Sequence, residues 1–186
     1  MSDGSGTATG SFALRAASVL EPATGIAVVP GWIVVADGRI SAVEGRAPAA
    51  IETIDLGEVT LLPGLIDTHT HLLLQPDDTS PPVATRKTIP MRTIEGVAAA
   101  RVALRLGFTT VRDVDNEGAR HADTALRDAI AGGIVQGPRM LVASDAITIS
   151  GGAMTYGSGM NAELDLPAKA AVADTPEAMV SEVRRQ

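Results

Sequence analysis

The distribution of apolar and polar residues divides the chain into two regions of different character. Between residues 12 and 62, short apolar runs alternate with turn-forming residues, which predicts a small β-sheet unit. The clearest pair of runs, residues 32–36 and 39–43, flanks Asp37-Gly38, a dipeptide that favours a tight hairpin turn with positive φ angles. Further strands are predicted at residues 12–20 and 54–61.

From residue 63 onward, the pattern changes to strands that alternate with helices. Apolar residues recur at helical spacing from Ala122 to Ile130, and Gly132-Gly133 is expected to end that helix. Thr175-Pro176-Glu177 supplies an N-cap, a proline at the first helical position and an early acidic residue, which predicts a final helix. The other predictions are strands at 65–73, 108–111 and 140–143, and a helix at 93–106.

This alternation predicts parallel βαβ units with right-handed crossovers. Three parallel strands leave sheet edges that need a partner, since parallel sheets are normally covered and extended on both sides. A complete eight-stranded barrel takes about 250 residues, and residues 63–186 are too few for one. We therefore expect the N-terminal portion of a longer protein. Residues 1–11, mostly Gly, Ser, Thr and Ala, predict a disordered N-terminus.

The charge and the cysteine content of the chain argue against several classes of function. The 186 residues carry 22 acidic and 15 basic side chains, a net charge of −7 that argues against nucleic-acid or anionic-membrane partners. No cysteine is present, which excludes thiol catalysis and thiolate metal sites, so a metal ion would need histidines and carboxylates. No stretch resembles a targeting or membrane-spanning segment, and the expected location is cytoplasmic.

The chemical signal lies on the first strand of the second region. Two of the three histidines stand two residues apart, at His69 and His71. Along a strand side chains alternate, so Asp67, His69 and His71 share one face, with Cα atoms of neighbouring pairs about 7 Å apart. Both imidazoles could then reach one ion at about 2.1 Å from each ring nitrogen. The other interpretation is that the two histidines are hydrogen-bonded polar residues that line a core.

Asp67 has three possible roles on that face: a ligand, a partner that orients a histidine ring, or a structural acceptor. We favour the orienting role. Two histidines make only half of a metal site, and a barrel lumen can provide further ligands from later strands.

Several segments resemble the amidohydrolase superfamily. Residues 61–71 resemble its opening signature, and residues 34–43 its sandwich hairpin. Residues 107–113, 126–130 and 137–140 resemble the branch with imidazolonepropionase-like enzymes and Xaa-Pro or Xaa-Arg dipeptidases. The resemblance implies an α/β fold: the N-terminal part of a (β/α)8 TIM-type barrel, about three βα units in residues 63–186, after a small β-sandwich segment in residues 12–62.

The resemblance also implies a chemistry. His69 and His71 would bind the more buried of two divalent ions, with zinc expected, and a metal-activated hydroxide would hydrolyse an amide or related C–N bond. The family's bridging lysine, two further histidines and final aspartate come from later strands. Neither lysine of this chain, Lys87 or Lys169, lies on an apolar strand, so we expect both to be solvated and the chain alone to be inactive.

The substrate implied by the resemblance is a small-molecule amide, cyclic amide or dipeptide. Many dipeptidase-like relatives have Gly-Gly-His after the third strand, where this chain has Gly151-Gly152-Ala153 with Tyr156 nearby. This departure argues against a dipeptide. Tyr156, Arg112 and Asp113 are candidates for the mouth of the active site, although a structural ion pair or loop anchor suits Arg112 and Asp113 as well.

Two other interpretations concern a calcium site and a non-catalytic function. The run from Asp113 to Gly118 resembles the start of a calcium loop, but its twelfth position is Thr124 where a bidentate Glu belongs. The alternative function is a non-catalytic, stand-alone α/β protein that self-associates through its open sheet edge as a homo-oligomer and binds a partner or at most one metal ion.

Overall fold

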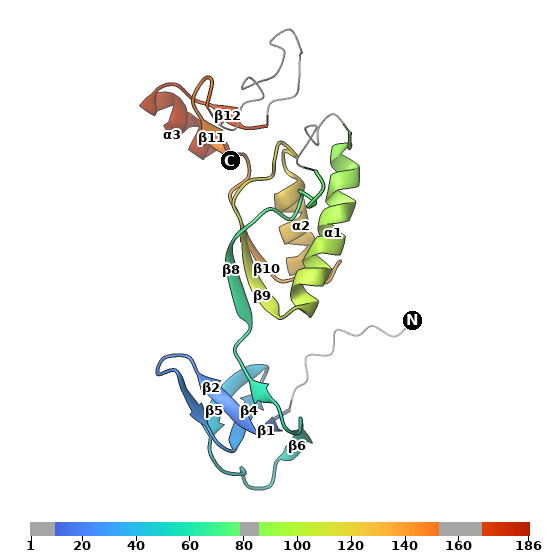
Figure 1. Ribbon diagram of the computed structural model, residues 1–186, viewed down its shortest axis with the longest axis vertical. Coiled ribbons are helices and arrows are strands. Elements are labelled where there is room, and N and C mark those ends of the chain that lie inside the picture. Colours follow the sequence, from blue (N-terminus) through green and yellow to red (C-terminus); the bar gives the residue numbers. More distant parts are fainter. Residues whose placement is uncertain (1–9, 79–85, 153–168) are drawn as a thin grey trace. The chain divides into compact units, whose positions relative to one another are not determined.

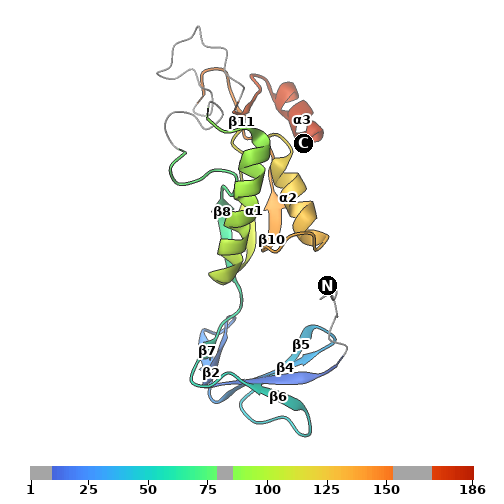
Figure 2. The ribbon, with the colours of Figure 1, turned by 90° about the vertical axis from the view of Figure 1, so that its right-hand side faces the viewer.

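The computed structural model describes residues 10–78, 86–152 and 169–186. The chain divides into two compact units, Met1–Pro63 and Gly64–Gln186. Figure 1 shows the order of their elements, and Figure 2 shows them after a quarter turn. The prediction for residues 1–11 falls largely on residues 1–9, which lie outside the described part.

The first unit consists of two β-sheets. One has four strands in the order β5-β4-β1-β6, and the other has three in the order β3-β2-β7. The predicted hairpin is confirmed: β4 and β5 pair antiparallel, and Asp37 and Gly38 between them have φ angles of 51° and 72°. The strands are β1 (Phe12–Ala16), β2 (Ser18–Glu21), β3 (Ile26–Val28), β4 (Gly31–Ala36), β5 (Arg39–Glu44), β6 (Glu52–Asp55) and β7 (Thr60–Leu61).

Two strands predicted as continuous are each divided between the two sheets. Residues 12–20 form β1 and β2, which separate at Ala17, and residues 54–61 contain the end of β6 and all of β7. The backbone N–H of Ala17 is not part of either strand ladder and donates instead to the carbonyl of Gly57, at 3.2 Å. Gly31 permits the close approach of the sheets here, because a Cβ would lie 2.6 Å from the backbone nitrogen of Val19.

The second unit is built on a parallel sheet of three strands in the order β10-β9-β8. Two helices cover one side of it (Figures 1 and 2). No closed barrel is present among the described residues; the architecture is mixed α/β with a three-stranded parallel sheet. The elements are β8 (Leu65–Thr70), α1 (Ile89–Arg105), β9 (Phe108–Asp113), α2 (Ala122–Ala131) and β10 (Arg139–Val142).

The core of this unit lies between the sheet and the helices. Its largest members are the fully buried Leu73, Leu126 and Val111, with Met140 from β10 and Ala100 from α1. Because β9 contributes Val111 to this core and leaves Arg112 exposed, the alternation expected of a strand is present. The apolar stripe predicted for α2 is confirmed in part: Ala122 and Leu126 are buried and Ile130 packs against the core, whereas Ala125 is exposed.

In the second unit, two predicted boundaries differ from the observed ones by three or more residues, one for a local reason and one for a long-range reason. Helix α1 begins at Ile89 rather than residue 93, because Thr88 accepts a side-chain hydrogen bond from the backbone N–H of Met91 and Pro90 suits the first turn. Strand β8 ends at Thr70 rather than residue 73, because the backbone N–H of Leu72 donates to the Asp113 carboxylate instead of a strand partner.

The last part of the chain adds a short sheet and a helix. Strands β11 (Ile147–Thr148) and β12 (Ala171–Val172) pair in parallel, and neither strand was predicted from the sequence. Helix α3 (Pro176–Arg185) begins as predicted, with the Thr175 side chain accepting from the N–H of Ala178 at 3.2 Å. None of the helices in the described ranges is both long and apolar enough to cross a bilayer.

Candidate functional site

The two predicted histidines lie side by side at the end of β8. His69 belongs to the strand and His71 follows its last residue. Their ring centroids are 5.3 Å apart, with ring planes inclined by 66°. His69 is exposed, whereas the His71 side chain is 29% exposed. The structure therefore brings the two imidazoles together, although His71 has already left the strand.

Asp67 contacts the main chain of this motif. Its Oδ1 accepts the backbone N–H of His69 at 3.0 Å. This contact fixes the backbone that carries His69, which is the structural-acceptor role; orientation of a histidine ring by Asp67 stays a prediction.

The parallel pairing of β8 and β9 brings the residues after both strands to one edge of the sheet. Thr70 is paired with Asp113, the last residue of β9. Asp113 is fully buried and its Oδ2 accepts the N–H of Leu72 at 2.9 Å, which anchors the turn after His71. Burial raises the pKa of Asp113 to about 6, and the neighbouring Asp123 carboxylate acts in the same direction. Arg112 is exposed.

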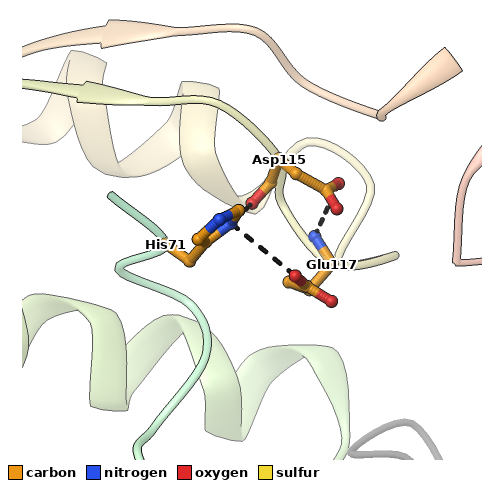
Figure 3. Close-up of side chains that lie close together, drawn as sticks. All are labelled: His71, Asp115 and Glu117. Atoms are coloured by element: carbon orange, nitrogen blue, oxygen red, sulfur yellow. Dashed lines mark hydrogen bonds and ion pairs between the residues drawn. The ribbon is translucent and has the colours of Figure 1, made fainter. Parts of the chain in front are cut away.

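An acidic loop after β9 lies against His71 (Figure 3). The Nδ1 atom of His71 is 3.2 Å from the carbonyl oxygen of Asp115 and 3.6 Å from Oε1 of Glu117. One potential ligand atom from each of these three residues lies within 4.8 Å of the others. Asp115 and Glu117 were not predicted as partners of His71, because the run that contains them was interpreted only as the start of a calcium loop.

The acidic loop is buried and tightly held. Asp115 and Glu117 are 3% and 4% exposed. Oδ1 of Asp115 accepts the N–H groups of Glu117, at 3.0 Å, and Ala146, at 3.2 Å, while its Oδ2 is buried without a hydrogen-bond partner. Burial raises the pKa of Asp115, and the Lys169 ammonium and His71 act against this. A buried carboxylate is costly unless a positive charge lies nearby, and the Lys169 ammonium acts on Asp115 in this way.

The expectation that both lysines are solvated is wrong. Lys169 forms an ion pair with Glu117, and Lys87 pairs with Asp78 and Glu95 at 3.0 and 2.9 Å. The lysine side chains are only 19% and 26% exposed at Lys87 and Lys169. The buried carboxylates of Asp78 and Glu117 explain the difference, because a buried charge needs an opposite charge beside it.

Arg92 connects the two loops that meet at the site. It lies on α1 and is 1% exposed. Its Nε donates to the carbonyl of Leu73 at 3.2 Å and its Nη2 to the carbonyl of Asn116 at 3.0 Å. The guanidinium therefore links the turn after His71 to the acidic loop.

A cavity of about 670 Å³ lies beside the first turns of α1 and α2. Its wall includes Lys87 and Arg185, which already form ion pairs, Arg185 with Asp145 at 3.0 Å. Lys87 and Arg185 are thus already neutralised by carboxylates of the protein. The pair of His69 and His71 is therefore the stronger candidate for a catalytic site. Tyr156, which was predicted to lie near the active-site mouth, and Ala153 of the Gly151-Gly152-Ala153 run lie outside the described residues.

The donor set suits a borderline divalent ion such as zinc. The chain has no cysteine, and imidazole nitrogens with carboxylate oxygens are common zinc ligands. His69 and His71 supply two adjacent imidazoles, and the buried Asp115 and Glu117 stand behind His71.

Comparisons with known proteins identify a family and several similar folds. The profile of the "Amidohydrolase family" matches residues 60–184. Among solved structures, a Xaa-Pro dipeptidase with methionine bound in its active site has a TM-score of 0.78 and 25% identity over 94% of this chain and 44% of its own. A prolidase complexed with N-methylphosphonate-L-proline gives 0.75 and 26%, and an amidohydrolase gives 0.74 and 29%, each over 94% of this chain and 43% of its own.

This chain therefore spans less than half of the length of these solved structures, and corresponds to their N-terminal portion. No curated protein sequence matches it.

Proposed function

The chain belongs to the amidohydrolase family, and on this premise we propose that it is the N-terminal portion of a metal-dependent hydrolase that cleaves amide or related C–N bonds. The observation that carries the proposal is the pair of imidazole rings, 5.3 Å apart, at the carboxyl end of the first parallel strand. Barrel enzymes build their active sites at this end of their strands.

His69 and His71 are the residues that would hold a divalent ion, with zinc the proposed metal. With an ion held there, the site would gain the two contributions that amide hydrolysis requires: a lower pKa of bound water and a polarised carbonyl group. The histidines need a fixed backbone for this role. Asp67 holds the N–H of His69 at 3.0 Å, and Asp113 holds the N–H of Leu72 at 2.9 Å.

The complete enzyme is proposed to be binuclear and to have a closed (β/α)8 barrel, with further ligands from later strands. Because His69 and His71 would make up only part of that centre, we expect the chain alone to bind metal without hydrolysing amides. The substrate is proposed to be a small amide, cyclic amide or dipeptide. The ligands of two of the similar structures, methionine and N-methylphosphonate-L-proline, support a compact amino-acid-like substrate.

Zinc titration tests the proposal. The chain has three histidines, so His69→Ala and His71→Ala can be compared with His121→Ala, a matched control at the start of α2. We expect wild type and His121→Ala to bind one equivalent of zinc in competition with a chromophoric chelator, and the other two variants to lose at least about tenfold in affinity. Equal affinity in all four proteins would contradict the assignment.

A further inference from the structure

We propose that Glu117, held by its ion pair with Lys169, is a positioning residue for His71: with the carbonyl of Asp115, it keeps the His71 proton on Nδ1 and so presents Nε2 to a metal ion. The proposal rests on the proposed function only in taking His71 as a ligand.

The tautomer follows from the groups that face Nδ1. The carbonyl oxygen of Asp115, at 3.2 Å, can only accept a hydrogen bond. Oε1 of Glu117, at 3.6 Å, is a carboxylate oxygen and is likewise an acceptor when ionised. Both groups therefore favour a proton on Nδ1. In a neutral imidazole the lone pair then lies on Nε2, the nitrogen left for a metal ion.

Glu117 can act in this way because its own position is fixed. Its side chain is 6% exposed, its backbone N–H donates to Oδ1 of Asp115 at 3.0 Å, and Lys169 pairs with its carboxylate. The Glu117 carboxylate lies beyond hydrogen-bond distance from Nδ1, so its effect on the imidazole is electrostatic. A fixed negative charge beside an N–H group makes the other nitrogen a better metal ligand.

The Lys169 ion pair also explains why this cluster is not itself assigned as the metal site. Lys169 already supplies Glu117 with a positive charge. The His71 nitrogen that faces Asp115 and Glu117 is the one bonded to a carbonyl oxygen. The arrangement thus places acceptors behind the ring and leaves its opposite nitrogen for coordination.

The first test measures the tautomer of His71 in the metal-free chain by long-range ¹H–¹⁵N correlation near pH 8, above the usual imidazole pKa of about 6.5. With three histidines, single His→Ala variants assign each ring. We expect Nδ1–H for His71 in wild type, and a shift toward a mixture of tautomers in Glu117→Gln. A predominant Nε2–H form in wild type overturns the proposal, and this result requires no variant to fold.

The second test measures zinc affinity of Glu117→Gln against Glu95→Gln. Glu95 also pairs with a lysine, Lys87, but lies on α1 and has no hydrogen bond or ion pair with either histidine among the described residues, so it is a matched control. We expect Glu117→Gln to bind zinc roughly tenfold more weakly, with Glu95→Gln unchanged. Equal affinities overturn the proposal, and so does a ¹⁵N shift that shows zinc on Nδ1 of His71, because Asp115 and Glu117 would then ligate directly.

The two tests separate this inference from the proposed function. If wild type fails to bind zinc, the proposed function fails, while the tautomer measured without metal still decides the role of Glu117. If zinc binds and depends on His69 and His71, but the tautomer does not respond to Glu117→Gln, only the positioning role is lost.

Discussion

The Nη2 atom of Arg92 donates a 3.0 Å hydrogen bond to the carbonyl oxygen of Asn116, and the same guanidinium donates through Nε to Leu73. Arg92 is only 1% exposed, and its charged side chain connects the turn after His71 with the loop after β9. Arg92→Met would leave both buried carbonyls without this donor.

We expect Arg92→Met to lower the free energy of unfolding by about 3 kcal/mol, since each buried hydrogen bond to a charged group contributes about 1.5–3 kcal/mol. Urea unfolding followed by circular dichroism at 222 nm measures this, because all the described helices lie in the second unit. Arg101→Met, an exposed position on the same helix, is the control. Similar losses in both variants would show that the link between the loops contributes little.

The pH dependence of stability should reveal the buried Asp123. Its carboxylate is fully buried and accepts the N–H groups of Thr124 and Ser144, at 2.8 and 3.0 Å, and burial raises its pKa. The folded state therefore holds this proton to a higher pH than the unfolded state, whose carboxyl pKa is about 3.9. As pH rises above that value, this group makes wild type progressively less stable.

The measurement compares wild type with Asp123→Asn at pH 4 and pH 7. Wild type should lose stability relative to this variant as pH rises. Asp128→Asn should show the opposite trend, because the hydrogen bond from Arg127 lowers the pKa of the exposed Asp128 carboxyl and so stabilises the fold at higher pH. The same slope in both comparisons would refute the assigned environments.

Gly31→Ala tests the close approach of the two sheets in the first unit. The added Cβ would lie 2.6 Å from the backbone nitrogen of Val19, so the backbone itself must move. We expect a loss of about 1–3 kcal/mol, the usual cost of overpacking. Fluorescence of Trp32, the chain's single tryptophan, reports on this unit. Gly10→Ala, where a Cβ meets nothing within 4 Å, should be neutral.

Zinc should stabilise the second unit through the histidine pair. A ligand that binds only the folded state adds about 2.7 kcal/mol at one hundred times its Kd. We expect the thermal midpoint of wild type, monitored at 222 nm, to rise with zinc and to return after chelation. The midpoint of His69→Ala should not respond to zinc. A rise of the same size in His69→Ala would assign the effect to other ligands.

Local patterns predicted the elements well where the deciding interactions are local. The Asp37-Gly38 turn and the start of α3 at Thr175 depend on neighbours in sequence, and both are present. The early start of α1 also has a local signal, Thr88 followed by Pro90, which the apolar spacing of residues 93–106 obscured. The end of β8 had no such signal, because it depends on Asp113, 41 residues away from Leu72.

The sequence spacing of His69 and His71 was enough to predict the histidine pair, whereas the acidic residues beside His71 were not predicted. Asp115 and Glu117 are 44 and 46 residues beyond His71, and they meet it because parallel β8 and β9 end together. The predicted βαβ order could have indicated this proximity, since adjacent parallel strands bring the loops that follow them to the same edge of the sheet. The burial of Lys169 against Glu117 required the actual path of the chain.

The pairing of Thr70 with Asp113 has a consequence for insertions and deletions. Removing one residue from β9 would draw the acidic loop back by about 3.3 Å and send alternate side chains to the opposite face. An added residue beside Gly133, where a Cβ would meet open space, disturbs no such alignment. Natural length variation in this protein should therefore gather at the turn after α2 and avoid the strand that leads to Asp113.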